Sequence, residues 1–321
     1  MGKYVVRRLF MGLGTLVGAS MIIFFILRII PGDAALMILT SRSSQDEARI
    51  DPKQLQELRE QLGTNRPLYV QYGDWIKSLA TGNLGVSLFN GTSVAHELRI
   101  RFPFTFQLAL LSVLFASVVG VSLGLLAAFK RNTMWDYVAR VLGIAGITLP
   151  VFWSATLMIF FLVYFFKWIP PLEFEYLWKD PGTAATQLVW PTVALGYYLA
   201  GVISRITRAQ ALEILRQDYI RTAYAKGLSS RVVVVRHALR NAMLPVVTII
   251  GLQFAALLSG TVLVEAIFHI PGLGSLMLQG IRQRDYPVVQ TLFILFAAIV
   301  IVANLTVDIL YSVLDPRIRY S

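Results

Sequence analysis

Six runs of apolar residues, each long enough to cross a lipid bilayer as a helix, constrain this chain more than any other feature. A helix needs roughly 20 apolar residues to span the hydrocarbon core of a membrane. Inside lipid every backbone N–H and C=O must be paired within its own segment, so runs of this kind form helices. The expected spans are Leu9–Ile30, Phe102–Phe129, Val141–Phe166, Thr183–Ser204, Asn241–Val264 and Val288–Ile309. The sequence therefore predicts an all-α polytopic membrane protein with six transmembrane helices.

Positive charge gathers on one side of these spans. The N-terminus carries +3, segment 130–140 carries +2 and segment 205–240 carries +6, whereas the alternate segments are close to neutral. Because Lys and Arg accumulate on the cytoplasmic side of membranes, this pattern places both termini in the cytoplasm. The formal net charge of +11 follows from the same rule, and we expect no nucleic-acid partner.

The long polar segment 33–101 predicts a folded extracytoplasmic cap between the first two spans. It carries eight basic and eight acidic residues, and it contains helix signals. Asp51-Pro52 begins one helix that Gly63 ends, and Pro67 begins a second. The expected organisation is a cytoplasmic N-terminus and first helix (1–32), the cap (33–101) and a five-helix core (102–321) that contains the loop 205–240.

The loop 205–240 contains a short, separately capped helical pattern. Asp218 is the expected N-cap and Gly227 the residue just past the C-terminus. Apolar and small side chains recur with helical spacing at Ile220, Ala223, Tyr224 and Gly227. A short helix with a small apolar face predicts docking on another protein. The alternative is an ordinary positively charged loop that contacts anionic lipid.

The same loop carries a family resemblance. Arg221-Thr222-Ala223 with Gly227, followed by His237 to Pro245, resembles the signature loop of permease subunits of ATP-binding-cassette importers. The general motif of these permeases reads Glu-Ala-Ala, three residues, Gly. Arg221 and Thr222 depart from it in the manner of the dipeptide/oligopeptide/nickel branch. Further matches cover the chain at Pro31-Gly32-Asp33, Gly82–Ser87, Phe268–Gly274 and Asp315–Arg317, although Asn83 stands where Asp is more frequent.

The resemblance implies a role for each part of the chain. The helix in the loop would dock on a cytoplasmic ATP-binding subunit through Asp218, Tyr219, Ile220, Ala223, Tyr224 and Gly227. The implied assembly contains a homologous second permease, two ATP-binding subunits and an extracytoplasmic solute-binding protein, embedded in lipid of a prokaryotic inner membrane. The chain lacks a Gly-x4-Gly-Lys-Ser/Thr phosphate loop, so ATP would act on the partner subunits and this chain would carry no cofactor. The implied substrate is a peptide or a related small solute.

Other functions find less support in the residues. No ionisable residue lies near the middle of a predicted span, which argues against the alternative of an ion-coupled secondary transporter or channel. The chain has no cysteine, and its three histidines lack metal-ligand spacing, so we expect neither an enzyme nor a metal site. Gln107, Gln253 and Asn304 lie within spans. They either line a transport pathway or form hydrogen bonds between helices.

Overall fold

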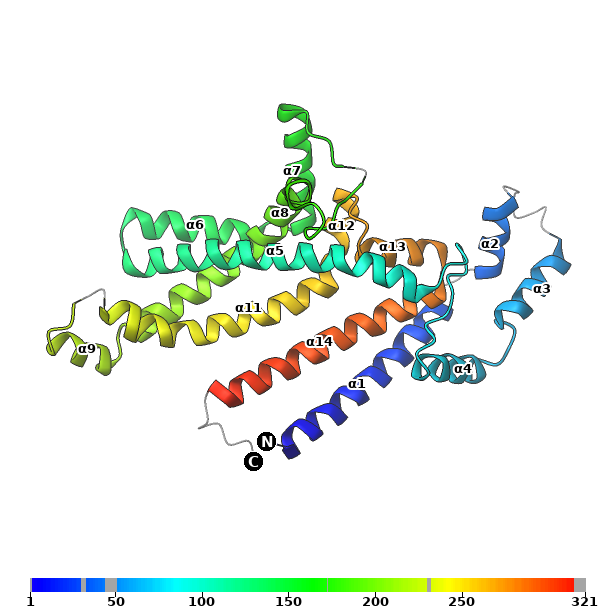
Figure 1. Ribbon diagram of the computed structural model, residues 1–321, viewed down its shortest axis with the longest axis horizontal. Coiled ribbons are helices and arrows are strands. Elements are labelled where there is room, and N and C mark those ends of the chain that lie inside the picture. The colour runs from blue at the N-terminus through cyan, green and yellow to red at the C-terminus, as the bar shows by residue number, and fades with distance from the viewer. Residues whose placement is uncertain (1, 30–32, 44–50, 172, 230–231, 315–321) are drawn as a thin grey trace. The chain divides into compact units, whose positions relative to one another are not determined.

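The computed structural model describes residues 2–29, 33–43, 51–171, 173–229 and 232–314, most of which are helical (Figure 1). The helices are α1 (Gly2–Ile29), α2 (Ala34–Ser43), α3 (Pro52–Leu62), α4 (Leu68–Ala80), α5 (Val94–Phe129), α6 (Met134–Thr148), α7 (Val151–Phe166), α8 (Pro181–Ile214), α9 (Asp218–Ala225), the π-helix η2 (Val233–Leu239), α11 (Arg240–Gly260), α12 (Val262–Phe268), α13 (Leu273–Gln283) and α14 (Tyr286–Leu314). Pro31, Gly32 and the motif Asp315–Arg317 lie outside the described residues.

Four helical segments are by themselves long and apolar enough to cross a membrane: Val6–Ile29, Val94–Phe129, Arg240–Gly260 and Tyr286–Thr306. Two bent pairs, α6 with α7 and α12 with α13, also pass this test when each pair is taken together, which raises the number to as many as six. Helix α8, which contains the fourth predicted span, is not among these candidates. The structure thus agrees with an all-α polytopic protein, while the six spans and the side of the termini stay predictions.

The third predicted span, Val141–Phe166, is not one helix in the structure but two. The axes of α6 and α7 differ by 103° across the break at Leu149 and Pro150. Proline lacks a backbone N–H and drives the residue before it toward extended backbone. Leu149 has that conformation, with φ −84° and ψ 126°. Pro150 therefore ends one helix and starts another.

Two further boundaries differ from the sequence prediction. Helix α11 ends at Gly260, so Val264 belongs to the separate helix α12 and not to the fifth span. By contrast, α8 continues through the buried Pro191 and extends beyond Ser204, the predicted end of the fourth span, to Ile214. The first ten residues of the predicted loop 205–240 are therefore helical, and they carry Arg205 and Arg208 on a defined face.

The chain divides into two compact units, of which the first comprises residues 1–103 and 271–301. The two helices predicted within segment 33–101 form in this unit as α3 and α4. The Asp51 carboxylate accepts a hydrogen bond from the N–H of Lys53 at 2.9 Å, and Gly63 ends α3 with φ 67°. Buried apolar side chains from α5, α13 and α14 form a core: Val94, Leu273, Leu276, Val288 and Leu292.

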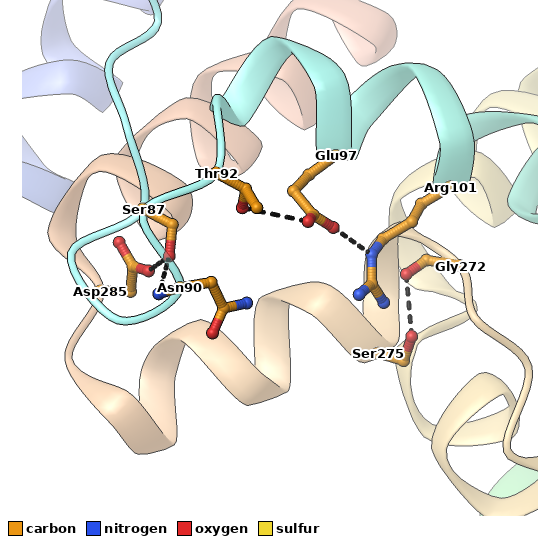
Figure 2. Close-up of polar contacts among 8 residues, drawn as sticks. All are labelled: Ser87, Asn90, Thr92, Glu97, Arg101, Gly272, Ser275 and Asp285. Atoms are coloured by element: carbon orange, nitrogen blue, oxygen red, sulfur yellow. Dashed lines mark hydrogen bonds and ion pairs between the residues drawn. The ribbon is translucent and has the colours of Figure 1, made fainter. Parts of the chain in front are cut away.

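Asp285, at the corner between α13 and α14, holds the turn that precedes α5 (Figure 2). Its carboxylate accepts hydrogen bonds from the Ser87 hydroxyl and, at 3.2 Å, from the Leu88 N–H. A second polar group lies close by, in which the Glu97 carboxylate accepts from Thr92 Oγ1 at 3.1 Å and from Arg101 Nε at 2.8 Å. These contacts fix the segment around Ser87 in space although it has little regular structure.

The second unit comprises residues 104–270 and 302–319. Its helices pack closely at glycines. A Cβ atom on Gly124 of α5 would lie 2.6 Å from the Ser204 carbonyl oxygen of α8. The unit also buries the Glu265 carboxylate, to which the hydroxyls of Thr105 and Thr261 each donate at 2.7 Å. Glu265 thereby connects the membrane helix α5 to the short helix α12.

Candidate functional site

The predicted docking helix forms as α9, a short helix beyond the end of α8 and before η2 (Figure 1). Its N-terminus differs from the expectation in one respect. Asp218 is the first helical residue and not the N-cap, a position that Gln217 occupies without a side-chain hydrogen bond. The Asp218 carboxylate lies 3.5 Å from the Arg221 guanidinium, and both side chains are exposed. An exposed pair of this kind adds little stability.

The C-terminus of α9 is strongly defined by Gly227. The Gly227 N–H donates to the Tyr224 carbonyl at 2.9 Å, and the Leu228 N–H donates to the Ala223 carbonyl at 3.3 Å. These two bonds constitute a Schellman motif, which requires left-handed backbone at the residue after the cap. Gly227 has φ 78°, as the motif needs. A Cβ atom there would meet nothing within 4 Å in this chain, so backbone conformation and not space explains the glycine.

The inner face of α9 packs on the chain's own neighbouring segments. Ile220 and Ala223 are buried against Val233 and Ala238 of η2, with Ile214 and Leu215 at the edge of the cluster. Sequence reasoning placed Ile220 and Ala223 on a docking face. Their side chains instead seat α9 on its own loop, because a helix this short needs tertiary packing to be stable.

The outer face of α9 presents two tyrosines. Tyr219 and Tyr224 are 42% and 43% exposed, which is unusual for such large side chains in a packed segment. The Tyr219 hydroxyl also accepts a hydrogen bond from Asn241 Nδ2 at 3.1 Å. Asn241 belongs to α11, so this bond ties α9 directly to a membrane helix. Of the six predicted docking residues, Asp218, Tyr219, Tyr224 and Gly227 are therefore the ones that a partner could reach.

A buried ion pair lies near the same end of α8 and was missed in the sequence. Asp136 of α6 is fully buried, and its two carboxylate oxygens accept from Arg208 Nε at 3.0 Å and Arg208 Nη2 at 3.1 Å. The Asn132 N–H and Arg140 also approach this carboxylate, each at 3.0 Å. The only signal in the sequence was one acidic residue within a basic segment.

The three predicted pathway residues do not share one environment. Gln107 is buried, and its Oε1 accepts a hydrogen bond from the Leu177 N–H at 2.8 Å. Its Nε2 has no partner among the described residues. Gln253 is half-buried and Asn304 is exposed. Their role in a pathway stays a prediction. Within the described part of the chain no three His, Asp or Glu side chains gather as metal ligands do.

Almost the whole chain matches two models of one protein family. Residues 120–320 match the model of the binding-protein-dependent transport system inner membrane component, and residues 1–109 match the model of its N-terminal region. The chain belongs to this family. It is the membrane-spanning permease subunit of an ATP-binding-cassette importer, a multi-pass protein of the prokaryotic inner membrane.

Curated relatives match the permease over its whole length. The di/tripeptide transport system permease protein DppB of Pseudomonas aeruginosa is 39% identical, and the glutathione transport system permease protein GsiC of Escherichia coli is 37% identical. Each alignment covers 99% of both chains. These relatives establish the peptide branch that the loop sequence resembles.

Two solved structures share the fold of the permease at low sequence identity. The MetNI methionine ABC transporter in an inward-facing conformation matches with a TM-score of 0.56 and 19% identity, over 68% of this chain and 96% of the other. An amino acid ABC transporter crystallised with histidines matches with a TM-score of 0.52 and 17% identity, over 76% of this chain and 98% of the other. Both likenesses concern the fold alone.

Proposed function

We propose that this permease forms part of the translocation path for short peptides and that α9 couples the path to ATP hydrolysis on partner subunits. The proposed assembly contains a second, homologous permease, two ATP-binding subunits and an extracytoplasmic solute-binding protein. The six-helix topology with cytoplasmic termini and the extracytoplasmic cap 33–101 are part of this proposal. The cap would receive the binding protein, and α9 would dock in a groove of the ATP-binding subunit.

The geometry of α9 is the observation that carries the coupling role. Its inner face is fixed by Ile220 and Ala223, while Tyr219 bonds to α11 and the tyrosines on the outer face are open to a partner. A helix held in this way moves as a rigid body. When the two ATP-binding subunits close, these contacts would pass a displacement of α9 to α8 and α11. A two-state switch of this kind requires partner contacts that differ between the two states.

The substrate class is inferred from relatives whose names refer to dipeptides, di/tripeptides and glutathione. All three are small peptides. Uptake of labelled di- and tripeptides by cells that contain the complete transporter tests this class. Competition by unlabelled peptides, but not by free amino acids, is expected. Gradient-driven flux by this chain alone would favour an ion-coupled secondary transporter instead.

Substitution of Tyr224 tests the docking role. The Tyr224 side chain is exposed and makes no side-chain hydrogen bond to a described residue, so Tyr224→Ala leaves the packing of α9 unchanged. We expect ATP-binding subunits to be lost from the purified complex while the second permease is retained. Tyr69→Ala in the cap is the matched control, because Tyr69 is 78% exposed and lies far from α9 in sequence. Normal ATP-binding subunit content and normal ATPase activity in Tyr224→Ala would contradict the proposal.

A further inference from the structure

A pocket of about 380 Å³ opens between α6 and α8. Its basic wall consists of Arg140 of α6 and Arg205 and Arg208 of α8, and its apolar wall includes Ile144 and Ile147 of α6. On each helix the lining residues recur at intervals of three and four, so each helix presents one continuous stripe to the pocket. The pocket is thus polar at one end and apolar at the other.

The basic end carries excess positive charge. Arg208 is bound in a bidentate arrangement to Asp136, and Arg140 approaches the same carboxylate at 3.0 Å. This contact joins the buried Arg140 Nε to Asp136 Oδ1 as an ion pair, without the geometry of a hydrogen bond. Arg205 is exposed, and the described part of the chain offers it no ion pair. Two guanidinium groups thus share the Asp136 carboxylate and Arg205 adds a third, which leaves a local charge of +2.

The positions of the lining residues along α6 and α8 determine which end of the pocket is basic and which is apolar. Arg140 lies in the middle of α6 and is the last residue of the segment 130–140, and Arg205 and Arg208 lie toward the C-terminal end of α8. The segments that contain these arginines, 130–140 and 205–240, carry the positive charge that marks the cytoplasmic side. From there the stripe passes through Gly143 and Ile144 to Ile147, deeper in the apolar part of α6. In the membrane orientation of the proposed function, the basic end would lie at headgroup level and the apolar end at acyl-chain level.

We propose that this pocket binds an anionic phospholipid of the cytoplasmic leaflet. The phosphate would accept hydrogen bonds from Arg205 and from Arg140, for which guanidinium groups have the right geometry. One acyl chain would lie along Ile144 and Ile147. A free phosphate ion would use only the basic end and leave the apolar wall uncovered. The inference rests on the membrane orientation in the proposed function and not on the docking of α9.

The test compares lipids retained by the intact transporter complex purified in mild detergent and analysed by native mass spectrometry. The probes are phosphatidylglycerol and phosphatidylcholine, supplied in equal amounts. We expect wild type to retain phosphatidylglycerol preferentially and Arg205→Gln to retain about five-fold less of it, since one basic residue at an anionic surface contributes on that scale. Arg216→Gln is the matched control, because Arg216 is exposed and lies outside the pocket.

Two outcomes would overturn the proposal. Equal retention of phosphatidylglycerol by the Arg205→Gln and Arg216→Gln variants would show that the charge of the pocket does not select lipid. Displacement of the lipid by millimolar inorganic phosphate, without any effect of Ile147→Ser on retention, would identify a free-anion site instead. A change of Tyr224 that removes the ATP-binding subunits is not expected to alter lipid retention, so the two proposals fail separately.

Discussion

Ser87 donates its hydroxyl to the buried carboxylate of Asp285, a residue 198 positions further along the chain. The same carboxylate accepts from the Leu88 N–H, and the Ser87 oxygen accepts from the Asn90 N–H at 3.1 Å (Figure 2). One side chain thus organises a turn that has no regular secondary structure to hold it. Ser87 belongs to the Gly82–Ser87 match through which the chain resembles its family, and its contact with Asp285 connects that match to the corner after α13.

Removal of this carboxylate should destabilise the first unit. We expect Asp285→Ala to cost about 1–3 kcal/mol, because the Ser87 hydroxyl and the Leu88 N–H would stay buried without an acceptor. Thermal unfolding of the purified protein in detergent measures the effect. Asp74→Ala is the control, since Asp74 forms only an exposed pair with Arg66 at 3.3 Å and its loss should change little. Equal unfolding temperatures for the two variants would contradict this account.

Removal of one partner of the Asp136–Arg208 pair should destabilise the protein more than removal of both partners. Asp136→Ala leaves a partly buried guanidinium without its bidentate partner, which typically costs about 3–5 kcal/mol. The double variant Asp136→Leu with Arg208→Met replaces the pair by apolar groups and should recover much of the loss. Thermal unfolding of Asp136→Leu, Arg208→Met and the double variant gives the coupling between the two residues. Additive losses would show that the pair contributes no coupling.

Two substitutions at Gly227 test whether the glycine is needed for its left-handed backbone or for close approach of the ATP-binding subunit. Asn tolerates left-handed backbone far better than the β-branched Val. We therefore expect Gly227→Asn to preserve α9 and Gly227→Val to loosen its C-terminus, as faster amide hydrogen exchange at residues 223–228 would show. If Gly227→Asn keeps α9 protected yet releases the ATP-binding subunits, the glycine also serves close contact with the partner. Normal protection and normal subunit content in Gly227→Val would contradict the conformational explanation.

The contact of α5 with α8 should tolerate no added methyl group at Gly124. A Cβ there would meet backbone at 2.6 Å, so the helices would have to move apart. Overpacking of this kind typically costs about 1–3 kcal/mol. Gly14→Ala in α1 is the matched control, because nothing lies within 4 Å of a Cβ at Gly14 and alanine favours helix. A lower unfolding temperature for Gly124→Ala alone is expected, and equal temperatures would show that the α5–α8 contact is loose.

Much of the fold was accessible from the sequence because its signals are local. Long apolar runs identify membrane helices without knowledge of their neighbours, and caps such as Asp51 and Gly63 act within one turn of the helix they bound. The loop around Gly227 predicted both a short helix and the family. For α9 the prediction from sequence was correct at the C-terminus, and it placed the N-cap at Asp218 where the structure has Gln217.

What only the tertiary structure decided depends on contacts between distant segments. The sequence showed Pro150 but not the 103° turn between α6 and α7, because a proline determines where a helix breaks and packing determines the angle. Spacing placed Ile220 and Ala223 on one face, but only η2 revealed that this face points inward. Asp136 with Arg208, and Ser87 with Asp285, are pairs of ordinary residues that burial makes consequential. Burial is a property of the folded chain, and no local pattern in the sequence encodes it.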